Sequence, residues 1–260
     1  LDQNSSALAQ LPLGSVVAES FIYALKDVDG DASYATLSIS VKTVDTTAPS
    51  VVLSMSDQAL KLGESAVVTF TFSEAITGFD LSDVTVDNGT LSNLQTADGG
   101  KTWTATFTAT ANVEDASNTI SVKDGSYTDL AGNIGTGNSI HYAIDNVAPN
   151  SGTTAITVDN ITADNVVNGQ EAKDNVLVTG KVSGEFQVGD VVTLILNGKS
   201  YLTQVINAAG DYSAFVKGSD LVADNDHVLE ASVAAHDLAG NVGIVGTQKG
   251  YGVDVSVDPA

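Results

Sequence analysis

Apolar and polar residues alternate over short runs along most of the chain, and glycine, asparagine and aspartate interrupt these runs. Residues 67–73 place Val68 and two phenylalanines on one side and threonine or serine on the other. Residues 102–110 repeat this arrangement, with Trp103 and Phe107 among alternating threonines. A period of two is typical of a strand with one buried and one wet face. Helical periodicity is hardly visible, so the pattern predicts an all-β protein.

Turn residues at regular intervals predict two tandem immunoglobulin-like antiparallel β-sandwiches, each with seven strands A to G. The strands expected in the first sandwich are 50–56, 65–73, 79–87, 90–96, 102–110, 118–123 and 138–144. The strands expected in the second are 154–159, 176–183, 190–197, 200–206, 211–217, 228–235 and 243–253. Residues 20–26 and 33–42 form only a hairpin, which is marginally stable alone in water. We expect this hairpin to end an upstream module, or to be completed by something outside the chain.

Two short motifs recur at a spacing of roughly 100 residues, the length of one immunoglobulin-like domain. The run Val-Asp-Thr-Thr-Ala-Pro-Ser at 44–50 returns as Ile-Asp-Asn-Val-Ala-Pro-Asn at 144–150. The run at 127–135 returns at 235–243, and both copies contain Asp-Leu-Ala-Gly-Asn. The expected division is therefore a partial β module at 1–45, an immunoglobulin-like domain at 46–145, and an immunoglobulin-like domain with a C-terminal linker at 146–260.

The charge of the chain restricts its partners. The 260 residues include 32 acidic and 10 basic side chains, all ten of them lysine, for a formal net charge of -22. Such a negative field repels nucleic acids and anionic lipids, and without arginine the chain lacks the bidentate donor that reads phosphates. No run reaches the roughly 18 apolar residues of a membrane span. These features exclude nucleic-acid binding and membrane insertion and favour divalent cations as ligands.

The chain offers neither disulfides nor the residue patterns of a catalytic site. Cysteine is absent, so thiolate metal sites are also excluded. His141, His227 and His236 have no plausible common site, and no Gly-x-Ser-x-Gly or His-Glu-x-x-His run occurs. We therefore expect no enzymatic activity. The chain begins at Leu1 without a signal peptide, and we expect it to be a fragment of a longer secreted protein.

Three stretches resemble repeat modules of very large bacterial adhesins. The hairpin from Glu19 to Ile39 resembles the end of cadherin-like or VCBS repeats. The runs at 67–74 and 129–133 look like bacterial Ig-like (BIg) domains of RTX-type adhesins secreted by type I systems, and 237–241 repeats the second run. The resemblance implies Ca²⁺ at the interdomain sites. It also implies an extracellular location at the bacterial cell surface and a role in cell adhesion and biofilm formation.

On this interpretation the chain is a structural extender, or stalk, whose partners are the neighbouring modules of the same polypeptide. It is expected to be a monomer, with any host or surface ligands bound through other regions. Two alternatives remain open. The last module could bind a peptide or glycan, through loops such as 165–174 and 218–226, or the chain could be a homophilic contact module of the cadherin kind.

Sandwich topology predicts where the acidic residues meet. The entering chain, the B–C loop and the F–G loop lie at one pole of an immunoglobulin-like sandwich. In the middle module these segments supply Asp45, Glu74 and Asp129. In the last module they supply Asp145, Glu185 and Asp237. Clusters of carboxylates with nearby carbonyls are the oxygen sites that calcium prefers, although each aspartate could also be only a turn residue.

Further acidic residues are expected at the opposite poles and at the hairpin tip. The E–F loop of the middle module carries Glu114 and Asp115, which should face Asp145. The remaining candidates are Asp224 and Asp226 directed towards Asp254 and Asp258, and the hairpin-tip residues Asp27, Asp29 and Asp31. The tip resembles the start of an EF-hand loop, but it lacks flanking helices and a following acid, so a β-hairpin calcium site is preferred.

Overall fold

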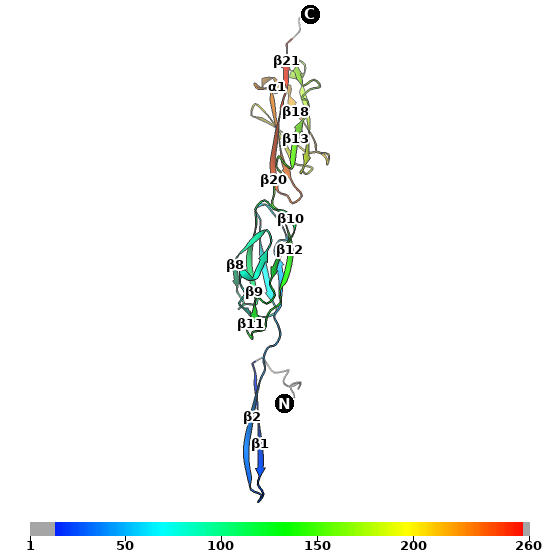
Figure 1. Cartoon of the computed structure of the whole chain (residues 1–260). Helices are drawn as coiled ribbons and strands as arrows, with labels where there is room; N and C mark the ends of the chain where they lie inside the picture. Colours follow the sequence, from blue (N-terminus) through cyan, green and yellow to red (C-terminus); the bar gives the residue numbers. More distant parts are fainter. Residues whose placement is uncertain (1–13, 257–260) are drawn as a thin grey trace.

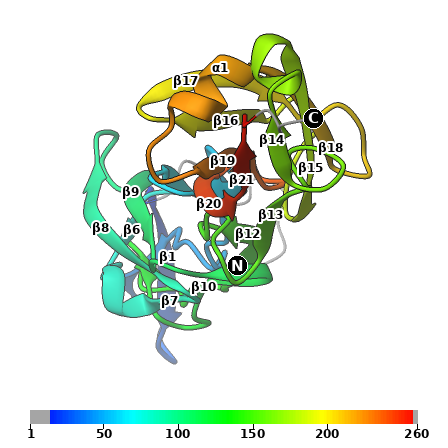
Figure 2. The ribbon, with the colours of Figure 1, turned by 90° about the horizontal axis from the view of Figure 1, so that it is seen from above.

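The chain is elongated, with a hairpin, a middle sandwich and a last sandwich arranged along one axis (Figure 1). The computed structural model describes residues 14–256. In the view along the axis, the last sandwich lies in front of the middle one and the hairpin lies behind both (Figure 2). Within the described residues no helix is long and apolar enough to cross a membrane. The predicted all-β class, with tandem immunoglobulin-like sandwiches after a partial β module, is confirmed.

The hairpin consists of β1 (Val16–Lys26) and β2 (Ala32–Lys42), paired antiparallel over their full lengths. No third strand of the described chain joins this sheet. Apart from Val17 and Val41, every residue of both strands is exposed. The hairpin therefore has no core among the residues described.

The middle sandwich packs two four-stranded sheets face to face. Its elements are β3 (Val51–Met55), β4 (Ala59–Lys61), β5 (Ser65–Phe72), β6 (Ile76–Thr77), η1 (Leu81–Asp83), β7 (Val84–Val86), β8 (Gly89–Thr96), β9 (Thr102–Ala109), β10 (Glu114–Val122), β11 (Thr128–Asp129) and β12 (Asn138–Asp145). One sheet has the order β3-β5-β9-β8 and the other β4-β12-β10-β7, while β11 and β6 form a small separate pair. Side chains alternate along each strand, so every second side chain points towards the partner sheet.

The core of the middle sandwich follows from this alternation. Phe70 and Phe72 of β5 are fully buried, and Phe79 packs edge-on against both at ring-centroid distances of 5.2 and 5.1 Å. Phe107 of β9 packs against Tyr142 of β12 at 5.0 Å, which joins the two sheets. Each buried phenylalanine contributes about 1.5–3 kcal/mol of transfer free energy. The threonines between these positions form the wet face, as predicted.

The last sandwich has a second, separate core that includes Val178, Leu194, Tyr212 and Val233. Its elements are β13 (Thr154–Val158), β14 (Val166–Asn168), η2 (Glu171–Lys173), β15 (Asn175–Gly184), β16 (Val191–Leu196), β17 (Lys199–Gln204), β18 (Asp211–Lys217), α1 (Gly218–Ala223), β19 (Val228–His236), β20 (Val242–Gly250) and β21 (Gly252–Asp254). The sheets have the orders β13-β15-β18 and β17-β16-β19-β20, and β14 pairs in parallel with β21.

The strand expected at 200–206, the fourth of the second sandwich, is observed as β17, which pairs with β16. Asn197 and Gly198 connect these strands with φ angles of 47° and 76°. Two residues with positive φ close a tight hairpin, so β17 must return along β16 and cannot cross to the opposite sheet.

Two further expectations about loops are wrong. Strand F of the middle sandwich was expected at 118–123, but β10 already begins at Glu114. Glu114 and Asp115 are therefore strand residues and do not lie in the E–F loop. The expected loop at 218–226 contains the helix α1, whose Leu221 is fully buried. A helix of six residues is too short for its periodicity to stand out in the sequence.

Candidate metal centres at the junctions

Three acidic side chains from distant segments meet where the hairpin joins the middle sandwich. Asp45 lies in the link after β2, Glu74 follows β5, and Asp129 ends β11. One carboxylate oxygen from each lies within 4.8 Å of the others. The predicted convergence of the entering chain, the B–C loop and the F–G loop is thus present at this pole. We call this cluster the first junction site.

The loop after β11 holds Asp129 in place. Its Oδ1 accepts hydrogen bonds from the backbone N–H groups of Ala131 and Asn133, both at 2.8 Å. Its Oδ2 accepts from the Asn133 side chain at 2.6 Å, and Asp129 is only 2% exposed. Burial raises the pKa of Asp129, but these hydrogen bonds outweigh it and leave the pKa below its ordinary value. Asp129 is therefore a fixed negative charge near neutral pH.

The pKa of Glu74 is shifted in the opposite direction, above its ordinary value. Desolvation raises its pKa first, and the charges of Asp45 and Asp129 raise it further, against a smaller opposing effect of Lys101. Asp45 accepts a hydrogen bond from the Thr47 backbone N–H at 2.9 Å, which orders the link. The three carboxylates therefore repel one another, and a cation placed between them would relieve that repulsion.

The first junction site opens into a hollow of about 540 Å³ between the hairpin and the middle sandwich. Asp45 and Glu74 line this hollow together with residues of the hairpin base and the exposed side chain of Leu130. All donors around the cluster are oxygens, with neither histidine nor cysteine among them. Such a donor set fits a hard divalent cation such as Ca²⁺.

At the second junction, between the two sandwiches, Asp145 and Asp237 approach each other. The side-chain amide of Asn241 donates to Asp237 Oδ2 at 2.8 Å and to Asp145 Oδ1 at 3.3 Å. Desolvation raises the pKa of Asp145, and the charges of Asp237 and then Glu185 raise it further. The charge of Glu185 thus reaches Asp145, but Asp145, Glu185 and Asp237 do not form a group of three close carboxylates. In the described chain, only the first junction site and the hairpin tip bring three acidic oxygens within 4.8 Å of one another.

Asn241 also connects the two sandwiches directly. Its Oδ1 accepts a hydrogen bond from the Leu62 backbone N–H of the middle sandwich at 2.7 Å. Its Nδ2 donates to the Asp145 backbone carbonyl at 2.9 Å. The equivalent Asn133 donates to the Asp45 carbonyl at 3.1 Å. Each asparagine therefore hydrogen-bonds its sandwich to the chain segment that enters it. Asn241 also hydrogen-bonds to Leu62 of the preceding sandwich.

Sequence reasoning missed the role of these asparagines. The repeated Asp-Leu-Ala-Gly-Asn run was expected to supply an aspartate as a metal ligand, with a simple turn as the alternative. Gly132 and Gly240 do adopt positive φ, at 92° and 88°, but Asn133 and Asn241 do not. The presence of asparagine in both copies was the available signal, and its hydrogen bond to the backbone carbonyl of the entering chain is the reason.

Glu114 and Asp115, the acidic residues predicted at the opposite pole of the middle sandwich, have different neighbours. Glu114 is the direct cross-strand partner of Asp145 in the β10–β12 pair, as the prediction of facing residues requires. Asp115 follows it on the strand, and its carboxylate accepts from the backbone N–H and Oγ of Ser117, both at 2.9 Å, and from Asn88. Successive strand residues point to opposite faces, so Asp115 does not share Glu114's neighbours.

Acids at the far end of the last sandwich have structural partners. Asp224 is buried, and its Oδ2 accepts from the Tyr251 hydroxyl at 3.0 Å and from the Val228 N–H at 3.1 Å. Asp226 Oδ1 accepts from the same N–H at 3.2 Å. Asp254 Oδ1 accepts from the N–H and Oγ of Ser256. No contact brings Asp254 to Asp224 or Asp226 in the described chain, and Asp258 lies outside the described residues.

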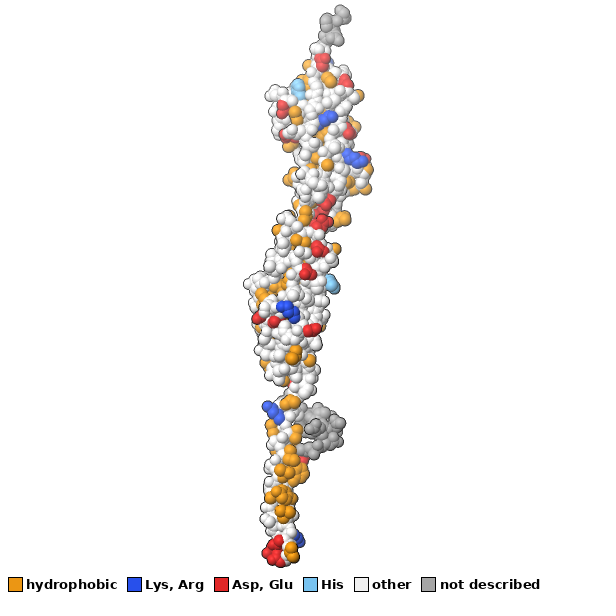
Figure 3. All heavy atoms as spheres, in the orientation of Figure 1, with side chains coloured by type: hydrophobic (Ala, Val, Ile, Leu, Met, Phe, Trp, Pro, Cys, Tyr) orange, Lys and Arg blue, Asp and Glu red, His pale blue; other side chains and the backbone are white. Residues whose placement is uncertain are grey.

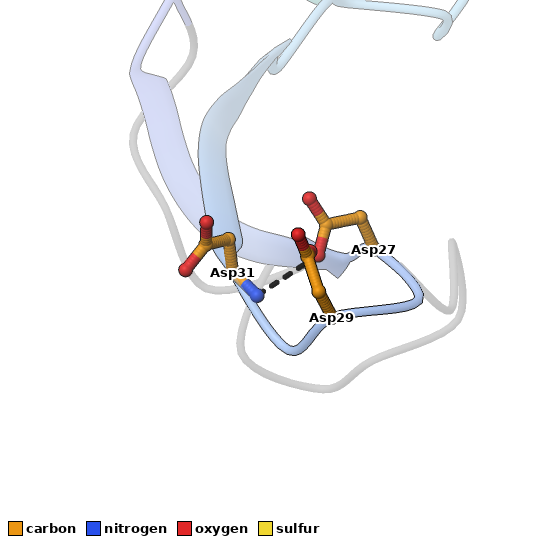
Figure 4. A group of neighbouring side chains, drawn as sticks. All are labelled: Asp27, Asp29 and Asp31. Atoms are coloured by element: carbon orange, nitrogen blue, oxygen red, sulfur yellow. Dashed lines mark hydrogen bonds between the residues drawn. The ribbon is translucent and has the colours of Figure 1, made fainter.

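The hairpin tip brings Asp27, Asp29 and Asp31 together (Figure 4). One oxygen of each lies within 4.8 Å of the others, and all three side chains are exposed. Asp27 Oδ1 accepts from the backbone N–H of Asp31 at 2.9 Å and of Gly30 at 3.1 Å. A hydrogen bond with Asp29, helped by these N–H groups against desolvation, lowers the pKa of Asp27. The space-filling view shows acidic side chains gathered at this tip and around the junction of the two sandwiches (Figure 3).

The chain is similar to bacterial adhesins of known structure. Residues 45–146 match the bacterial Ig-like domain family. A Ca²⁺-stabilised adhesin with which an Antarctic bacterium reaches out and binds ice has a TM-score of 0.61 and 29% identity, over 91% of this chain and 57% of that chain. A 1.5-MDa bacterial ice-binding adhesin has a TM-score of 0.60 and 25% identity, over 94% of this chain and 76% of that one.

The chain thus spans 57% of the length of the first of these relatives. A bacterial immunoglobulin-like domain from the M. primoryensis ice-binding adhesin is 40% identical, over 38% of this chain and 95% of that chain, with a TM-score of 0.36. No curated protein sequence matches the chain. Residues 45–146 thus belong to the bacterial Ig-like domain family, and the chain as a whole is similar in fold to segments of bacterial adhesins.

Proposed function

We propose that this chain is an extender segment of a secreted bacterial cell-surface adhesin, made rigid by Ca²⁺ at its junctions. The observation that carries the proposal is the first junction site, where Asp45, Glu74 and Asp129 come from three segments to within 4.8 Å of one another. One of these segments links the hairpin to the middle sandwich. A cation held by all three would tie that link to the body of the sandwich.

Electrostatics give the ion a mechanical role. Two carboxylates about 5 Å apart repel by roughly 3 kcal/mol at an effective dielectric constant of about 20. Without a cation, this repulsion favours arrangements in which the link moves away from the loops. A bound Ca²⁺ reverses the sign, and at about one hundred times its dissociation constant it stabilises the bound arrangement by about 2.7 kcal/mol.

The same physics suits an extracellular stalk. Calcium sites of extracellular modules have dissociation constants of about 10⁻⁴ to 10⁻³ M, so they fill outside the cell and stay empty inside it. The proposed partners are the neighbouring modules of the same polypeptide, and the proposed division is 1–45, 46–145 and 146–260. Export by a type I system and support of biofilm formation belong to the same proposal, as does the absence of enzymatic activity.

The test combines calcium titration with a measurement of molecular length. Isothermal titration calorimetry of the wild-type chain should show binding that is lost stepwise in Asp45→Asn and Asp129→Asn, while Asp57→Asn, away from the cluster, should bind as the wild type does. Small-angle scattering should show a longer, narrower distance distribution with millimolar calcium than with chelator. A chain that binds no calcium, or is equally extended in chelator, would overturn the proposal.

A ligand-binding role for the last sandwich is the second candidate. A hollow of about 510 Å³ lies over β16, β19 and β20, and its lining includes Thr193, Glu230, Ser232 and Gln248. These hydroxyl, amide and carboxylate groups could hydrogen-bond a sugar. Titration with a glycan array would favour this function if saturable binding were lost in Ser232→Val and retained in Asp45→Asn.

A further inference from the structure

The middle and last sandwiches meet end to end (Figure 1), and two buried asparagines lie at this junction. Asn146 is the first residue after β12 and is 6% exposed. Asn241 lies in the loop between β19 and β20 and is 3% exposed. Burying an amide is costly unless its donors and its acceptor are paired. The partners of these two side chains therefore show what fixes the junction.

Asn146 fixes the start of the link on the middle sandwich. Its Oδ1 accepts a hydrogen bond from the Val113 backbone N–H, and its Nδ2 donates to the Thr110 carbonyl, both at 2.7 Å. Its own backbone N–H donates to the Val113 carbonyl at 2.9 Å. Thr110 and Val113 lie in the loop between β9 and β10. Three hydrogen bonds therefore hold the link against this loop.

Asn241 attaches the last sandwich to the middle one at two separate points. Its Nδ2 donates to the backbone carbonyl of Asp145, the residue directly before Asn146, at 2.9 Å. Its Oδ1 accepts from the Leu62 N–H at 2.7 Å, and Leu62 lies in a different loop, between β4 and β5. A contact with the link alone would leave rotation about the link free. The second contact, on a separate loop, restricts both rotation and bending.

The first junction differs from this arrangement within the described part of the chain. The repeated motif aligns Thr46 with Asn146, but Thr46 is exposed. Asn133 donates to the Asp45 carbonyl at 3.1 Å, as Asn241 does to Asp145, yet its Oδ1 accepts no hydrogen bond from the hairpin. No hydrogen bond of the described residues joins β1 or β2 to the middle sandwich. The two-point attachment is thus a property of the second junction.

We propose that the second junction is a rigid joint built from protein contacts, in which Asn146 and Asn241 fix the angle between the sandwiches. Bending would separate Asn241 from Leu62 or Asn146 from Val113 and leave buried amide groups unpaired, which is unfavourable. Calcium bound beside Asp145 would add to a geometry that is already fixed. This joint goes beyond the proposed extender function, because two side chains supply its stiffness and no ion is required for it.

Pairs of spin labels on introduced cysteines test the joint, because the chain has no cysteine of its own. Thr108→Cys with Gln204→Cys spans the second junction, and Ser40→Cys with Thr71→Cys spans the first. All four residues are exposed. Pulsed electron paramagnetic resonance measures the distance distribution of each pair in millimolar calcium and in chelator. The second-junction pair reports on the joint, and the first-junction pair reports on the proposed role of calcium.

In chelator the distribution between positions 108 and 204 should be as narrow as it is in calcium. A distribution that is broad in chelator, whether or not calcium narrows it, would overturn the joint. The two proposals fail separately. If calcium does not narrow the distribution between positions 40 and 71, the calcium function is contradicted, while a narrow second-junction distribution in chelator still supports the joint.

Asn146→Ala and Asn241→Ala, alone and together, test which residues supply the stiffness. In chelator the second-junction distribution should broaden roughly two-fold when both side chains are lost, because domains of one chain move relative to each other unless contacts restrain them. Asn225→Ala, at an exposed asparagine of the last sandwich, is the matched control and should change nothing. An unchanged width in a double variant that circular dichroism shows to be folded would overturn the assignment. The wild-type comparison requires neither variant, so it decides the joint even where a variant fails to fold.

Discussion

The side-chain carbonyl of Asn241 in the last sandwich accepts a hydrogen bond from the backbone N–H of Leu62 in the middle sandwich at 2.7 Å. The two residues are 179 positions apart, and Asn241 is only 3% exposed. The same side chain also donates to Asp145 and Asp237. The second junction therefore has a direct protein–protein contact in addition to its acidic residues.

Asn241→Ala should loosen the second junction. The substitution removes the contact to Leu62 and leaves the carboxylates of Asp145 and Asp237 without their shared donor. The free energy of unfolding of the last sandwich should fall by about 1–3 kcal/mol. Chemical denaturation monitors the loss, and small-angle scattering with chelator should show a broader distance distribution than the wild type.

Asn133→Ala is the control for this prediction, because Asn133 occupies the equivalent position at the first junction. It should destabilise the middle sandwich and leave the last one unchanged. Equal behaviour of the last sandwich in both variants would contradict the assigned role of Asn241.

Glu74 should make the stability of the metal-free chain depend on pH. Its folded-state pKa lies above the ordinary value of 4.5 because of desolvation and the nearby charges of Asp45 and Asp129. A raised pKa contributes stability that is fully present below the ordinary value and is lost as the pH rises through the folded-state pKa. The melting temperature of the metal-free middle sandwich should therefore rise as the pH falls from neutrality through the folded-state pKa of Glu74 towards 4.5.

Glu74→Gln should remove this dependence, giving a higher and flatter melting temperature without metal and weaker calcium binding. Asp129 has the opposite sign, because its pKa is lowered from 3.8. Its stabilisation is present above that value and is lost as the pH falls further. Differential scanning calorimetry measures the Glu74 effect between pH 7 and about 4 and the Asp129 effect below about pH 4, the range in which carboxyl groups titrate. An identical pH profile for wild type and Glu74→Gln would rule out the electrostatic assignment.

Gly243→Ala should destabilise the last sandwich at its junction end. A Cβ at Gly243 would lie 1.7 Å from the Pro149 carbonyl oxygen, which is backbone and cannot rotate away. Overpacking of this kind typically costs about 1–3 kcal/mol. Gly250→Ala is the control in the same strand, because nothing lies within 4 Å of its added Cβ. Thermal unfolding of the two variants should differ clearly, and equal melting temperatures would refute the close contact.

Asp224→Asn should lower stability without changing calcium stoichiometry. Asp224 was predicted as a metal ligand, but in the structure its carboxylate accepts from the Tyr251 hydroxyl and the Val228 N–H. Weakening these charge-assisted bonds should cost about 1–3 kcal/mol of unfolding free energy. Calorimetric titration should count as many ions as in the wild type. Loss of one ion would restore Asp224 as a ligand.

The sequence by itself determined most of the long strands and which acidic residues meet at the first junction site. Alternation with period two is a local property, so the faces of β5 and β9 can be read from neighbouring residues. The poles of an immunoglobulin-like sandwich follow from its strand order, which is why Asp45, Glu74 and Asp129 could be brought together from positions far apart. The repeated motifs supplied the spacing of the sandwiches.

Only the tertiary structure decided which acidic residues face each other and which have other partners. Glu114 lies opposite Asp145 while Asp115 turns to Ser117, because register across two strands assigns alternate residues to opposite faces. Likewise, Asn241 reaches Leu62 only because two complete sandwiches meet there. Such contacts depend on the relative position of distant segments, and no local pattern of residues contains that information.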